Sequence, residues 1–64
     1  MAQLKPCPQS KIDVAEARAK REGQRCFVLF DTVMAEYRVV TLQTYRGCNL
    51  SAASRYEIVA TVDP

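Results

Sequence analysis

The chain of 64 residues contains no histidine, the side chain that most often serves as a general base or as a metal ligand. Its three cysteines, Cys7, Cys26 and Cys48, are far apart and form no C-x-x-C pair, so a zinc site would need a fourth ligand from an acid or from a second chain. An odd number of cysteines also cannot pair completely within one chain. These absences argue against a metal or another cofactor.

The usual sets of catalytic residues are missing as well. A cysteine or serine nucleophile needs an activating base, and only lysines and acids are present for that role. The acids Asp13, Glu16, Asp31, Glu36 and Glu57 do not have the spacing of a specific paired-carboxylate site. A chain this short is also too small to enclose a substrate pocket of typical volume. We therefore expect a protein that is not an enzyme.

No stretch of the sequence approaches the roughly 18 apolar residues of a membrane span. The start, MAQLKPCPQSK, lacks a basic region followed by an apolar segment, so we expect no signal peptide and a cytoplasmic protein with reduced thiols. Within this start, LKPCP resembles the opening of small zinc-ribbon phage proteins of the restriction-alleviation type. Gln9 and Ser10 stand where the second cysteine of such a ribbon would follow, so the resemblance implies no zinc site here.

The residues that are present are typical of one small globular domain, with 48% hydrophobic and 25% charged side chains. A chain of this length buries roughly 60% of the surface that its unfolded form exposes, so its stability is marginal when it is alone. Domains of this size usually gain stability from a disulfide, a metal or a partner. Because prolines flank Cys7, we expect residues 1–9 to form an extended tail and residues 10–64 to form the domain.

The segment SKIDVAEARAKREG predicts the first element of this domain, a helix. Ser10 is a suitable N-cap, and Gly23 is a suitable left-handed end. Ile12, Ala15 and Ala19 share one narrow face, which is thin and consists mainly of alanine. Such a helix packs close to a sheet but contributes little apolar area to the core.

Three strands are expected after the helix. The first is RCFVLFDTV and the second is VMAEYRVVTLQTYRG, in which Leu42 and Tyr45 are among the strand-forming residues. Gly47 and Asn49 mark a turn, and the segment NLSAAS is either a loop or one helical turn. The sequence thus predicts an α+β domain in which one N-terminal helix packs on a three-stranded antiparallel sheet, in the order α-β-β-β.

The third strand, RYEIVATV, alternates cleanly between its two faces. The residues expected to point one way are Tyr56, Ile58, Ala60 and Val62. Those expected to point the other way are Arg55, Glu57, Val59 and Thr61.

The first of these strands is apolar on both faces, because residues 26–30 are five apolar side chains in a row. One helix can cover only one face of a three-stranded sheet. The other face would then expose a patch rich in Phe, Leu and Val, and such patches usually mark an interaction site. In the alternative interpretation, the N-terminal tail and the NLSAAS segment fold over this face.

We therefore expect a protein that works by binding. The first hypothesis is a small regulator or inhibitor that docks on a larger host protein or complex through its open sheet, with a homodimer as a further expectation. Proteins this small without catalytic motifs are often phage or mobile-element accessory factors, such as anti-CRISPR proteins and inhibitors of host enzymes. The expected protein-binding residues are Phe27, Leu29, Tyr37, Arg38, Val39 and Arg55.

The alternative is a small nucleic-acid-binding module. A basic cluster at the end of the helix would contact phosphate, and arginine and tyrosine side chains on the sheet would stack on single strands. The cluster consists of Arg18, Lys20, Arg21 and Arg25. It also suits the negative end of the helix dipole, and the net charge of +2 supplies only a weak pull on a polyanion.

Overall fold

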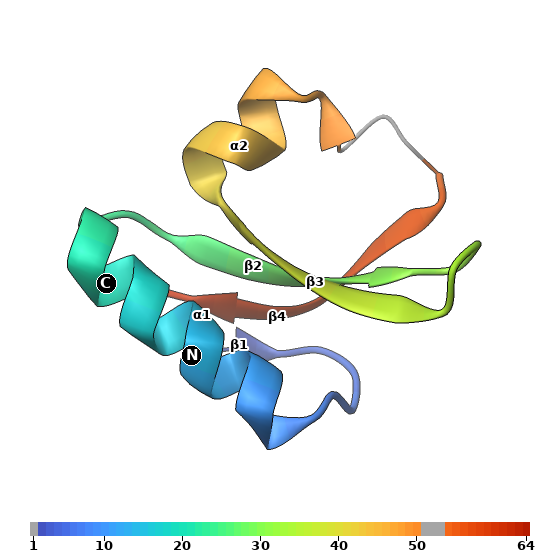
Figure 1. Ribbon diagram of the computed structural model, residues 1–64, viewed down its shortest axis with the longest axis horizontal. Helices are drawn as coiled ribbons and strands as arrows, with labels where there is room; N and C mark the ends of the chain where they lie inside the picture. Colours follow the sequence, from blue (N-terminus) through green and yellow to red (C-terminus); the bar gives the residue numbers. More distant parts are fainter. Residues whose placement is uncertain (1, 51–53) are drawn as a thin grey trace.

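A computed structural model describes residues 2–50 and 54–64 of the chain, with two helices and a four-stranded antiparallel sheet in the order β1-β4-β2-β3 (Figure 1). The elements are β1 (Ala2–Gln3), α1 (Gln9–Glu22), β2 (Cys26–Asp31), β3 (Glu36–Thr41), α2 (Leu42–Gly47) and β4 (Tyr56–Val62). The predicted α+β class, with an N-terminal helix followed by three antiparallel strands, is confirmed. The structure adds the short strand β1 and the helix α2.

The start of the N-terminal segment belongs to the sheet. β1 pairs with β4, with Ala2 opposite Thr61. The backbone N–H groups of Leu4 and Lys5 donate to the carbonyl of Val59 at 2.8 and 3.2 Å. Residues 2–5 therefore extend the edge of the sheet beside β4 and do not cover either of its faces.

The first helix, α1, begins one residue before the predicted N-cap. Pro8 occupies the N-cap position with extended backbone, and no side chain caps this end, so the prediction of Ser10 as the cap is wrong. A proline can stand here because its carbonyl still accepts the first helical bonds, from the N–H groups of Lys11 and Ile12. The predicted end is confirmed, since Gly23 adopts the left-handed conformation with φ at 63°.

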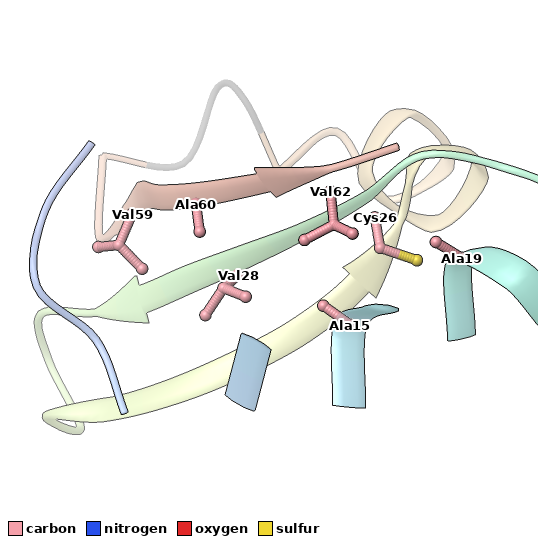
Figure 2. Packing of buried hydrophobic residues seen from close by; sticks show 7 residues of the cluster. All are labelled: Ala15, Ala19, Cys26, Val28, Val59, Ala60 and Val62. Carbon is pink, nitrogen blue, oxygen red and sulfur yellow. The ribbon is translucent and has the colours of Figure 1, made fainter. Parts of the chain in front are cut away.

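The core lies between α1 and one face of the sheet. Figure 2 shows Ala15 and Ala19 of α1 facing side chains of β2 and β4. Because alanine is small, the helix backbone can approach the strands closely, as the sequence predicts. The buried cluster consists of Ala15, Ala19, Cys26, Val28, Val59, Ala60 and Val62.

An irregularity in the pairing of β4 with β2 changes which side chains of β4 face this core. Val28 lies opposite Ala60 while the next residue of β2, Leu29, lies opposite Ile58, so Val59 is an extra residue at a bulge. The strict alternation predicted for β4 is therefore wrong at this point. Ala60 faces α1 together with Val28, whereas Ile58 faces the opposite side together with Leu29.

Strand β3 ends at Thr41, where the chain turns into α2. The prediction that this strand continues through Leu42 and Tyr45 is wrong. The Oγ1 atom of Thr41 accepts a hydrogen bond from the N–H of Thr44 at 3.2 Å, which is the arrangement of a helix N-cap. Gly47 thus ends a helix, and Asn49, with φ at 52°, forms the turn that follows.

Helix α2 covers the face of the sheet opposite α1 (Figure 1). The ring of Tyr45 packs on Phe27 with a centroid separation of 4.8 Å and an angle of 44° between the rings. Phe27 is buried, and Leu29 is 0% exposed. The expectation of an uncovered second face is therefore wrong. Tyr45 of α2 packs on this face, residues 2–5 lie at the sheet edge, and residues 51–53 of NLSAAS lie outside the described residues.

Candidate functional site

The six residues expected to bind a protein partner lie on both faces of the sheet. In the β2–β3 register Val39 lies opposite Val28, and Tyr37 lies opposite Phe30, so Tyr37 and Val39 face α1. Phe27 and Leu29 face α2 and are buried there. The four apolar residues therefore do not form one contact patch.

Tyr37 and Val39 pack against the core cluster under α1 and are only partly exposed. The ring of Tyr37 lies 5.1 Å from that of Phe30, and its hydroxyl donates to the carbonyl of Pro6 at 3.5 Å. The carbonyl of Val39 accepts a hydrogen bond from Arg18 at 3.0 Å. Both side chains thus help to hold α1 and the N-terminal segment on the sheet.

The two predicted arginines do come together, at the carboxylate of Asp31. Arg55 binds it with two hydrogen bonds, from Nε to Oδ1 at 3.2 Å and from Nη2 to Oδ2 at 2.6 Å. Arg38 approaches the same carboxylate, with Nε at 3.6 Å from Oδ2. Asp31 is fully buried, so the two arginines compensate a charge that would otherwise be costly to remove from water.

The hydrogen bonds from Arg55 lower the pKa of Asp31 to about 2, against the opposing effect of burial, and the backbone N–H groups of Met34 and Val33 lower it further. The same pairing raises the pKa of Arg55. Asp31 is therefore ionised throughout the physiological pH range. The analysis of the sequence treated it as one acid among several. Its position directly before a four-residue turn was the available signal, because an aspartate there can bond to the backbone of the turn.

The buried carboxylate also holds the turn between β2 and β3, which we call the hairpin tip (residues 32–35). Oδ1 of Asp31 accepts hydrogen bonds from the N–H groups of Val33 and Met34 at 3.0 and 3.1 Å. The backbone N–H and the hydroxyl of Thr32 donate to the carbonyl of Arg55 at 2.7 and 2.8 Å. The tip is thus bound to both β2 and the start of β4, which fixes its conformation.

Two large apolar side chains project from this tip. Val33 is 68% exposed and Met34 is 56% exposed. The tip lies at the right-hand end of Figure 1, clear of both helices. Arg38 and Arg55 contact Asp31 at its base. Methionine and arginine are both enriched at protein interfaces. The candidate functional site therefore consists of Val33, Met34, Arg38 and Arg55, held by Asp31.

The basic residues of the alternative hypothesis are largely paired with acids. Arg18 and Arg21 lie 3.9 and 3.8 Å from Glu22, and Nε of Arg25 lies 2.7 Å from Oδ1 of Asp63. Lys20 is exposed. Because these exposed pairs offset part of the positive charge, the attraction to a polyanion is weaker than the sequence suggests.

Comparisons with protein-family models, with curated proteins and with solved structures gave no match for this chain. Over residues 2–50 and 54–64, no group of three or more His, Cys, Asp or Glu side chains is placed to hold a metal ion. The three cysteines are free thiols. No helix in the described part of the chain has both the length and the hydropathy needed to cross a membrane.

Proposed function

We propose that this chain is a small non-catalytic protein that binds a larger protein or complex, and regulates or inhibits it, through the hairpin tip. The observation that carries the proposal is the exposure of Val33 and Met34 on a turn that the buried carboxylate of Asp31 holds in place. Side chains on a turn that is already ordered lose little conformational freedom on binding, so more of the apolar contact contributes to affinity.

The arginines beside the tip supply the polar part of this surface. Arg38 and Arg55 are both partly exposed, and each guanidinium has five N–H donors, of which Arg55 uses only two on Asp31. The side chains of Arg38 and Arg55 are 48% and 39% exposed, so donors that Asp31 and Glu36 leave unused can reach a partner. An apolar centre with a polar rim is the common composition of a protein–protein interface, so we place the partner contact at Val33, Met34, Arg38 and Arg55.

The class of protein proposed here is an accessory factor of the phage or mobile-element type, for example an anti-CRISPR protein or an inhibitor of a host enzyme, acting in the cytoplasm. A binding surface built on one turn supports this class. A partner with an apolar pocket bordered by carboxylates would fit the convex tip and its arginines.

The experiment compares three single variants in one binding assay. Immobilised wild-type protein captures the partner from an extract of the host cells, and calorimetry then measures the dissociation constant with the purified partner. We expect Val33→Ser and Met34→Ser each to weaken binding at least fivefold, equivalent to about 1 kcal/mol. Leu4→Ser is the matched control, because Leu4 is 67% exposed but lies outside the tip, and it should leave the dissociation constant unchanged.

The proposal fails if both tip variants bind the purified partner with the wild-type dissociation constant. If nuclease treatment of the extract abolishes capture and binding weakens steeply with salt, the nucleic-acid alternative is correct instead. Circular dichroism of each variant confirms that the fold is intact, which we expect because the replaced side chains are exposed.

A further inference from the structure

The outer edge of β3 is a second surface that the hairpin tip does not explain. β3 is the last strand in the order β1-β4-β2-β3, so one of its sides has no neighbouring strand among the described residues. Such an edge presents backbone N–H and C=O groups that can pair with another chain. Two properties restrict what can pair with this edge: which of its residues point their backbone N–H and C=O groups outward, and where its charges lie.

One hydrogen bond at the end of the β2–β3 pair shows which residues of β3 point their backbone groups toward the free edge. The N–H of Leu42 donates to the carbonyl of Arg25 at 2.8 Å, so the backbone groups of this pair point toward each other. Pairs of this kind alternate along an antiparallel ladder with pairs whose backbone groups point apart. Tyr37 and Val39, at odd spacings from Leu42, therefore point their N–H and C=O groups to the free side. The bond from Arg18 to the carbonyl of Val39 agrees with this direction.

The charges on β3 distinguish between the ways in which this edge could pair with the same edge of a second copy. Around a two-fold axis, antiparallel strands place residues opposite each other at equal distances from the axis. An axis at Glu36 or at Arg38 places two like charges directly opposite each other, which is unfavourable. An axis at Tyr37 places Glu36 of each copy opposite Arg38 of the other copy, giving two pairs of opposite charge.

An axis at Val39 is disfavoured for a different reason. It would place Arg38 opposite Val40 and Glu36 opposite Leu42, so neither charge of β3 would gain a partner of opposite sign. The axis at Tyr37 uses the outward N–H and C=O of Tyr37 at its centre. Among these registers, it alone pairs the charges of β3 favourably.

We propose that the free edge of β3 binds the same edge of a second copy of this chain, in an antiparallel dimer centred on Tyr37. Glu36 and Arg38 are both exposed and lie on the α2 side of the sheet, where they can reach the other copy. On the α1 side, Val14 is 47% exposed and lies one helical turn before Arg18, whose guanidinium reaches the β3 edge. The strand of the second copy covers this valine.

The test uses charge exchange in the purified chain, so its outcome is separate from that of the hairpin tip and its partner. Sedimentation velocity over a concentration series measures the dimer dissociation constant. We expect Glu36→Arg to raise it at least tenfold, because each Arg38 then faces an arginine. Arg38→Glu should do the same, and the double exchange Glu36→Arg/Arg38→Glu should restore the dimer.

A mixture of the two single variants gives the sharpest result. One variant carries two arginines and the other two glutamates at these positions, so mixing them should form a heterodimer while each alone is monomeric. Glu57→Arg is the matched control, because Glu57 is an exposed strand glutamate on β4 and should leave the dimer unchanged. Since Arg38 also approaches Asp31, Glu36→Gln serves as a milder variant if Arg38→Glu does not fold, and it should weaken the dimer about threefold.

Three outcomes overturn the proposal. A wild-type chain that stays monomeric over the whole concentration series has no dimer at this edge. A dimer that Glu36→Arg and Glu36→Gln leave unchanged uses another surface. A chain that remains monomeric but binds an extended peptide along β3, with loss of hydrogen exchange at the Tyr37 and Val39 amides, uses the edge for a different occupant.

Discussion

Replacing Leu29 by alanine tests whether the second face of the sheet is a packed core. Leu29 is 0% exposed, and it lies opposite Arg38 of β3 and Ile58 of β4 on the side that α2 covers. Truncating a buried leucine removes its transfer free energy and leaves a cavity, at a cost of about 2–5 kcal/mol. For 64 residues, the total free energy of unfolding is about 3–10 kcal/mol. Leu29→Ala should therefore remove a large part of the stability of the domain.

Urea denaturation followed by circular dichroism measures this loss. With a denaturant dependence of about 1 kcal/mol per molar urea, the midpoint should fall by about 2 M or more. Val33→Ala, in the same hairpin but 68% exposed, is the control and should change the free energy of unfolding by less than about 0.5 kcal/mol. A midpoint for Leu29→Ala that matches the control would refute the reasoning, because it would mean that this face of the sheet is not a packed core at Leu29.

Two further predictions concern the hairpin and the N-cap of α2. The pKa of Asp31 is lowered to about 2 from its ordinary value of 3.8, so its contribution to stability is complete above about pH 4 and is lost as the pH falls toward 2. Asp31→Asn should remove this part of the acid dependence, and an unchanged acid-denaturation curve would contradict it. Thr41→Ala removes the side-chain acceptor for the N–H of Thr44 and should lower the free energy of unfolding by about 1 kcal/mol, whereas Thr41→Ser should retain most of it. Equal denaturation midpoints for these two variants would show that the cap does not stabilise α2.

The parts of the fold that were predicted correctly depend on local patterns. The alanine stripe of α1 and its end at Gly23 follow from the helical period and from the one residue that adopts positive φ easily. The antiparallel strands follow from runs of β-branched and aromatic residues. Such patterns are visible because neighbouring residues in the chain are also neighbours in the structure.

The second helix was missed because six residues are too few to show a helical period, and its tyrosine suits a strand as well as a helix. The only local signal was Thr41 three residues before Thr44, which forms the N-cap. That one omission had a large consequence. Without α2, one face of the sheet has no cover, and Phe27 and Leu29 are taken for contact residues although they are buried.

The candidate site was predicted in part. Arg38 and Arg55 were named from their residue type, but Asp31, which joins them, was not, because they come from three different strand regions. The exposed pair Val33 and Met34 was treated only as part of a connection between strands. The position of Asp31 before the turn signalled its bonds to the turn backbone, but sequence patterns could not reveal that this carboxylate is buried or that the two side chains next to it are exposed.

The sequence by itself determined the α+β class, the helix that packs through alanines and the apolar character of β2 on both faces, since each depends on the order of neighbouring residues. Only the tertiary structure decided which residues share a face. The register pairs Val39 with Val28, and the bulge at Val59 moves Ile58 to the other side. A shift of one residue between strands exchanges the two faces, and contacts between distant segments determine that shift.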